Sequence, residues 1–171
     1  TIMVQDAPLS GVDLDVPLLI KMAKEIEAVK CFKIECSQAA SKLRKLVVEG
    51  GDAIEGPFDG EEGITLFADL EAGATGNMSS AMIPDLIKPV VLDYLAGEFD
   101  KSEDKYNNIL PLINYENRQC GFRATKVIMK VGGVINSDFC RHPIPPLEEQ
   151  TKSGLIKLVK KYDPIALSWG K

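Results

Sequence analysis

The sequence has few of the residues on which metal and nucleophile chemistry most often depends. It contains a single histidine, His142, and its four cysteines form no CxxC pair and no zinc-type spacing with that histidine. A thiol nucleophile needs a neighbouring base, and none stands beside Cys36 in the sequence. We therefore expect no metal site, no catalytic role for His142, and reduced thiols in a cytoplasmic protein.

Excess positive charge and long apolar runs are also missing. Lysine and arginine total 20 against 25 acids, and the basic residues are interleaved with the acids. Phosphate binding needs a concentrated basic face, and crossing a bilayer needs about 20 apolar residues in a row. These absences argue against a nucleic-acid partner and against a membrane partner.

The first half of the chain alternates two kinds of apolar pattern. Short apolar runs predict strands, and amphipathic spacing between them predicts helices. Asp15 is suited to cap the first helix, and two acids at 61 and 62 suit the first turn of the third. The expected strands are 2–5, 29–36, 53–58 and 74–78, and the expected helices are 16–26, 39–48 and 61–71. Such alternation predicts parallel strands joined by right-handed crossovers.

The second half changes to helical patterns alone. Helices are expected at 83–96, 101–117, 121–131 and 151–162, with a proline-bearing loop at 135–146. No linker separates the halves, so we expect residues 1–81 and 82–171 to act as one structural unit. Four parallel strands suit a small open sheet or half of a closed eight-stranded barrel.

The second expected strand carries the most informative pair of residues. Lys33 and Glu35 are two positions apart, which places both side chains on one face, while Phe32 and Ile34 point to the other. A lysine shielded from water gives up its proton more readily and then becomes nucleophilic. The pattern is therefore typical of an enzyme that forms a Schiff base, although a solvated edge strand would show the same alternation.

These residues resemble the dihydrodipicolinate synthase and N-acetylneuraminate lyase family over the whole chain. The strand around Lys33 is similar to the family's sixth strand, which carries the Schiff-base lysine. The sequence Gly60-Glu61-Glu62 resembles the turn after strand seven, and 73–77 resembles the entry into strand eight. The resemblance implies an α/β fold: the C-terminal half of a (β/α)8 TIM barrel, strands five to eight, with a C-terminal helical extension. The chain would then be part of a longer protein.

One position departs from the common family pattern. Gln5 stands where most members have a proton-shuttling tyrosine, and an amide cannot act as an acid or base. Together with 56–62 and 114–119, the segment 5–11 resembles the family's dehydratase branch, which converts 2-keto-3-deoxy-L-arabonate to 2-oxoglutarate semialdehyde. The resemblance therefore implies a hydro-lyase.

The resemblance also implies roles for individual residues. Lys33 would form a covalent imine with a small 2-keto acid substrate, so that no other cofactor is needed. Glu35 would move protons, and Gln5 would hydrogen-bond the substrate or a water. Asn77, Ser79 and Glu61 are the candidate substrate-binding residues. Family members often form dimers or tetramers, which implies a homo-oligomer.

Two alternatives remain open at this point. The first is an aldolase or pyruvate lyase of the same family, against which Gln5 argues. The second is an inactive half-barrel, because the first four strands of the family supply much of the substrate carboxylate site. A half-barrel also leaves two strand edges unpaired, so we expect this polypeptide alone to be poorly soluble or self-associating, and to be inactive.

Overall fold

The structure is a computed structural model that describes residues 1–171. The chain divides into two compact units. The first comprises residues 1–79 with 94–97, and the second comprises residues 80–93 with 98–171. That residues 1–81 and 82–171 act as one structural unit stays a prediction.

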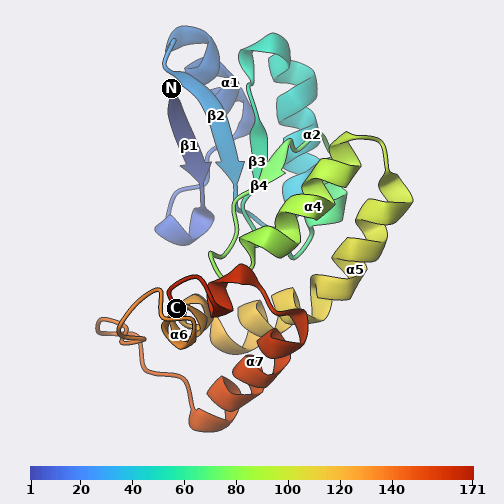
Figure 1. The fold of residues 1–171 in the computed structure, drawn as a ribbon. Helices are drawn as coiled ribbons and strands as arrows, with labels where there is room; N and C mark the ends of the chain where they lie inside the picture. The colour runs from blue at the N-terminus through green and yellow to red at the C-terminus, as the bar shows by residue number, and fades with distance from the viewer. The chain divides into compact units, whose positions relative to one another are not determined.

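The first unit is built on a four-stranded parallel sheet (Figure 1). The strands follow one another in the order of the chain, β1-β2-β3-β4, and each pairs in parallel with the next. They are β1 (Ile2–Asp6), β2 (Val29–Ile34), β3 (Pro57–Asp59) and β4 (Gly76–Asn77). The parallel α/β arrangement predicted from the alternation is therefore confirmed.

Three of the strands are shorter than predicted. β2 ends at Ile34, so the last residues of the expected 29–36 strand lie beyond it. β3 begins at Pro57 because residues 51–53 form a 3-10 turn and Gly56 has a positive φ of 55°. A proline suits the first position of a strand, since it has no N–H to donate. β4 is reduced to two residues.

Three helices connect the strands: α1 (Val16–Glu25), α2 (Ala39–Gly50) and α3 (Leu66–Glu71). Figure 1 shows α1 and α2 packed on the sheet, and both contact β2. Asp15 caps α1 as predicted, because its Oδ1 accepts a hydrogen bond of 2.8 Å from Leu18 N. Placing Glu61 and Glu62 in a first helical turn was wrong: Glu62 has a φ of 58°, and α3 begins only at Leu66.

The core of the first unit lies between the sheet and these helices. Phe32 and Ile34 of β2 are fully buried, as the alternation of that strand predicted. Each fully buried side chain of this size contributes about 1.5–3 kcal/mol relative to exposure. The fully buried side chains that the three helices contribute include Leu19, Leu43, Leu46 and Leu66.

The second unit is helical, and the predicted helices are confirmed with ends displaced by a few residues. It contains most of α4 (Pro84–Leu95), then α5 (Phe99–Tyr115), α6 (Arg123–Val131) and α7 (Glu149–Tyr162). A π-helical turn at Glu116–Cys120 follows α5. Residues 135–146 contain neither helix nor strand, as expected for a proline-bearing loop.

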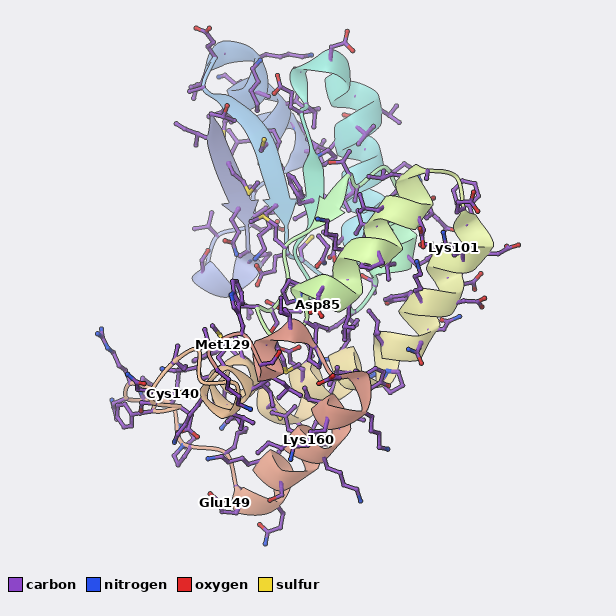
Figure 2. All side chains as sticks on the ribbon, viewed as in Figure 1. Asp85, Lys101, Met129, Cys140, Glu149 and Lys160 are labelled. Atoms are coloured by element: carbon purple, nitrogen blue, oxygen red, sulfur yellow. The ribbon has the colours of Figure 1, made fainter.

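Side-chain contacts tie the second unit together, and Figure 2 shows where one of the residues involved, Asp85, lies near the start of α4. Asp85 at the start of α4 accepts a hydrogen bond of 2.9 Å from Ile165 N. Asp138 in the loop forms ion pairs of 2.6 Å with both Lys130 and Lys152. None of the helices combines the length and the apolar character that crossing a bilayer requires. The four cysteines are free of disulfide bonds.

Candidate active site

A lysine and a glutamate form an ion pair at the carboxyl end of β2. Lys33 Nζ lies 2.8 Å from Glu35 Oε2, and the two side chains are 15% and 25% exposed. Glu35 lies just past the strand, but its backbone N–H still donates to Asp6 O at 2.8 Å, which extends the ladder by one residue. The pair therefore occupies the face of the sheet opposite the buried Phe32 and Ile34.

Gln5 joins this pair from the neighbouring strand. Gln5 of β1 is in register with Lys33 of β2. Its Nε2 donates to Glu35 Oε2, the same oxygen that faces the lysine amine, over 2.5 Å. The structure thus brings together the three residues predicted to be catalytic. Lys33 and Gln5 both donate to the same carboxylate oxygen, Glu35 Oε2.

The turn after β3 lies directly against the pair. Gly60 N donates to Ile34 O at 2.9 Å, which holds the turn beside the end of β2. A β-carbon at position 60 would stand 2.9 Å from both Lys33 Cγ and Glu35 Cβ. Only glycine can therefore occupy this position without displacing the side chain of Lys33 or Glu35.

The predicted substrate-binding residues take different positions. Asn77 is in register with Asp59, which is in register with Ile34, so Asn77 lies on the face opposite Lys33. Its Nδ2 donates to Asp59. Glu61 follows the Gly60 turn, and Ser79 is half-buried beyond β4. A role in substrate binding for these three residues stays a prediction.

Sequence reasoning missed two buried carboxyl groups, Asp59 at the end of β3 and Asp69 in α3. Both residues are fully buried, and each carboxyl group acts on the pKa of the other. Burial raises the pKa of Asp59, and burial together with the charge of Asp59 raises the pKa of Asp69 to about 7. Asp69 lies between Leu66 and Leu70 on the buried face of its helix, and this position was the available signal.

The chemistry of the site is that of an amine with a carboxylate beside it. Lys33 can act as a nucleophile once it loses a proton, and Glu35 is placed to exchange protons with a group bound to it. The structure contains no cluster of three or more side chains suited to hold a metal ion. A lysine with a carboxylate beside it, at the carboxyl end of a parallel strand, is the arrangement that imine formation would require.

Comparison with protein families identifies the class more closely. Residues 1–162 match the model of the dihydrodipicolinate synthetase family. The chain belongs to this family.

Two curated relatives and one solved structure illustrate the match. L-2-keto-3-deoxyarabonate dehydratase of Azospirillum brasilense is 52% identical over 98% of this chain and 54% of its own length. 4-Hydroxy-tetrahydrodipicolinate synthase of Helicobacter pylori is 24% identical over 96% of this chain and 55% of its own length. The chain therefore spans about half the length of the curated relatives it matches.

The solved structure supports the fold. Dihydrodipicolinate synthase from Aquifex aeolicus superimposes with a TM-score of 0.84, over 95% of this chain and 55% of that one, at 20% identity. The agreement covers the sheet unit and the helical unit alike, since it extends over nearly the whole chain. The architecture is accordingly consistent with part of a barrel.

Proposed function

We propose that the protein to which this chain belongs dehydrates 2-keto-3-deoxy-L-arabonate to 2-oxoglutarate semialdehyde through an imine on Lys33. The observation that carries the proposal is the contact of Lys33 and Gln5 with one oxygen of Glu35. The 52% identity to a dehydratase with this named substrate supports the choice of reaction. The four strands would be the fifth to eighth of a complete barrel, with the helical unit as its extension.

The first step uses the amine of Lys33. The neutral amine attacks the C2 carbonyl carbon of the substrate, and loss of water gives a protonated imine. This imine withdraws electrons, so a proton on C3 becomes acidic enough for a carboxylate to remove. Glu35, whose carboxylate lies 2.8 Å from the amine, is placed to act as this base.

The second step expels the C4 hydroxyl group. Removal of the C3 proton gives an enamine, whose electrons form the C3–C4 double bond as hydroxide leaves from C4. The proton that Glu35 has taken can be returned to this hydroxyl, so that water departs. Loss of a C5 proton and reprotonation of the carbon chain then turn the C5 alcohol into an aldehyde, and hydrolysis releases Lys33. The sequence needs no oxidant and no further cofactor.

Gln5 favours dehydration over carbon–carbon cleavage. Cleavage requires a base that takes the proton of a substrate hydroxyl group, and an amide cannot serve as that base. The Gln5 amide instead donates to Glu35 and keeps its carboxylate beside Lys33. We propose that the protein acts as a cytoplasmic homo-oligomer on a small 2-keto acid.

Reductive trapping tests the proposal. The full-length protein is incubated with 2-keto-3-deoxy-L-arabonate and borohydride, and its peptides are mapped by mass spectrometry. We expect a covalent adduct on the peptide that contains Lys33, and 2-oxoglutarate semialdehyde when borohydride is omitted. An adduct together with released pyruvate would show a lyase instead, and no adduct on Lys33 would exclude both reactions.

The chain offers a matched control on the same strand. Lys30 is half-buried in β2, on the strand that also carries Lys33. Lys33→Ala is expected to abolish the adduct and the activity, whereas Lys30→Ala is expected to retain both. Loss of trapping in both variants would point to damage to the strand rather than to removal of the nucleophile.

A further inference from the structure

A second polar cluster lies on the helix side of the sheet, behind the Lys33 site. Asp59 at the end of β3 and Asp69 in α3 are both fully buried. Two buried carboxylates in contact repel each other strongly unless they share a proton. The pair therefore needs an explanation beyond packing.

The hydrogen bonds around the pair place its proton. Asp59 accepts from Glu61 N at 2.8 Å, from Asn77 Nδ2 and from the backbone of Gly63. Asp69 Oδ2 accepts from Thr65 Oγ1 at 2.8 Å, while its Oδ1 is buried and has no hydrogen-bond partner. Asp59, with more donors, is better stabilised as the anion. Asp69 therefore holds the proton and donates it to Asp59.

The charged groups that act on Asp69 are few. Its own helix carries one other acid, Glu71, while the largest charge effects on Asp69 come from Asp59 on the strand and from Glu61 in the turn, both of which are negative. Burial and these charges together favour the protonated form of Asp69, and Thr65 opposes them only in part. The shared proton is then the means by which two acids can coexist at this position.

The pair connects to Lys33 through one residue of backbone. Asp59 directly precedes Gly60, and the bond from Glu61 N to Asp59 fixes the far side of the same turn. Gly60 in turn lies against the aliphatic part of the Lys33 side chain, since a β-carbon added at position 60 would stand only 2.9 Å from Lys33 Cγ. A loosened acid pair would release the turn on which the lysine stem rests.

We propose that Asp59 and Asp69 form a proton-sharing positioning pair, which holds the Gly60 turn against Lys33 and so keeps the amine in place for imine formation. Neither acid touches the substrate in this account. The inference deepens the proposed function and rests on it, because the amine that is positioned is the proposed nucleophile.

The test uses Asp69→Asn in the full-length protein. An amide at position 69 donates to Asp59 at every pH, so it imitates the protonated acid permanently. The rate of borohydride trapping at Lys33 is measured for both proteins from about pH 6 to about pH 8.5, across the raised pKa of Asp69. We expect equal rates at the acid end, and a variant faster by roughly threefold or more at the alkaline end.

The inference would be overturned if the ratio of the Asp69→Asn trapping rate to the wild-type trapping rate stayed constant across this pH range. Methylation of Lys33 by formaldehyde and borohydride, with Lys30 as internal reference, supplies a readout that needs no keto acid. If the wild type traps no substrate, the proposed function fails, and the methylation ratio still decides the inference. Equal Lys33 to Lys30 ratios in both proteins at alkaline pH would then reject it.

Truncation provides an independent second variant. Asp69→Ala leaves Asp59 buried without its donor, and we expect trapping at least about tenfold slower than in Asp69→Asn. If the alanine variant does not fold, Asp69→Leu replaces it, because leucine fills the space but can neither donate to Asp59 nor accept from it. Unchanged trapping in the folded truncation or replacement variant would contradict a positioning role.

Discussion

Gly60 and Lys33 are in direct contact, although 27 positions of sequence separate them. A β-carbon at position 60 would stand 2.9 Å from Lys33 Cγ and 2.8 Å from Ile34 O. Real β-carbons do not approach other atoms this closely, so a side chain at position 60 and the present course of the lysine stem exclude each other.

Gly60→Ala is therefore expected to impair both folding and catalysis. A shift of the lysine stem relieves only part of the clash, because the backbone oxygen of Ile34 is closer still, so the turn must also move away from β2, at a cost of about 1–3 kcal/mol. The amine then leaves the position beside Glu35. We expect kcat to fall by about tenfold or more, since small displacements of a reacting group are costly. Steady-state kinetics and urea unfolding of the full-length variant check this, and unchanged kcat would contradict it.

Glu35→Gln should separate imine formation from proton transfer. The amide keeps the size of the side chain but cannot accept the C3 proton. We expect Lys33 to remain trappable by borohydride, while kcat falls by about 10²–10⁴-fold. Glu55→Gln, at an exposed position before β3, is the matched control and should leave kcat unchanged. Equal loss of trapping and turnover would show that Glu35 serves only to hold the lysine.

Gln5→Leu tests the third member of the site. The substitution removes the hydrogen bond from Gln5 Nε2 to Glu35 Oε2 and leaves the carboxylate free to rotate. Loss of one hydrogen bond to a charged group is worth about 1.5–3 kcal/mol, so we expect kcat/KM to fall by about tenfold to a hundredfold. Gln5→Glu should be worse still, because it places a second negative charge beside Glu35. A neutral result for both variants would remove Gln5 from the mechanism.

The raised pKa of Asp69 predicts how stability changes with pH. The folded state keeps the proton up to about pH 7, whereas the unfolded chain releases it near 3.8. The contribution of this group to stability is therefore complete at low pH and is lost as the pH rises through about 7. The urea midpoint of the wild type should fall as the pH rises from 3.8 to about 7. The midpoint of Asp69→Asn should fall less over the same pH range. Equal falls in the two proteins would argue against the shared proton.

The ion pair of Lys42 with its buried partner should contribute more to stability than the ion pair with its exposed partner. Its Nζ lies 2.6 Å from the fully buried Asp6 and 2.9 Å from Asp13, whose side chain is 74% exposed. Removing Lys42 leaves the buried carboxylate of Asp6 without its cation, so Lys42→Ala should lower the free energy of unfolding by about 3 kcal/mol. Asp13→Ala breaks only the solvated pair and should have a much smaller effect. Chemical denaturation of both variants measures the difference.

The face of β2 could be predicted because its alternation follows directly from strand geometry. Lys33 and Glu35 share one face, and the fully buried Phe32 and Ile34 share the other. The contact with Gln5 required more than this, since it depends on the register between two strands that a helix separates. Family resemblance, rather than periodicity, placed Gln5 near the lysine.

The acid pair was missed for a physical reason. A local pattern shows that Asp69 lies among apolar residues of α3, but not what it faces across the sheet. The start of that helix was misjudged for a different reason. Glu61 and Glu62 read as a first helical turn, yet Glu61 N is taken by Asp59 and Glu62 adopts a positive φ. The first miss concerns a contact between two elements, whereas in the second a local hydrogen bond from Glu61 N to Asp59, two residues earlier, replaces the helical turn.

Gln5, Lys33 and Glu35 all come from β1, β2 and the residue that follows β2, with α1 between the strands. A single β-α-β unit therefore carries the whole proposed imine-forming set, whereas the Gly60 turn and the candidate substrate-binding residues follow it in the chain. When genes of this family are recombined, crossovers after position 36 pass the set on intact, whereas crossovers between positions 5 and 33 divide it. Chimaeras of the first kind should inherit the reaction type of the parent that donated β1 and β2.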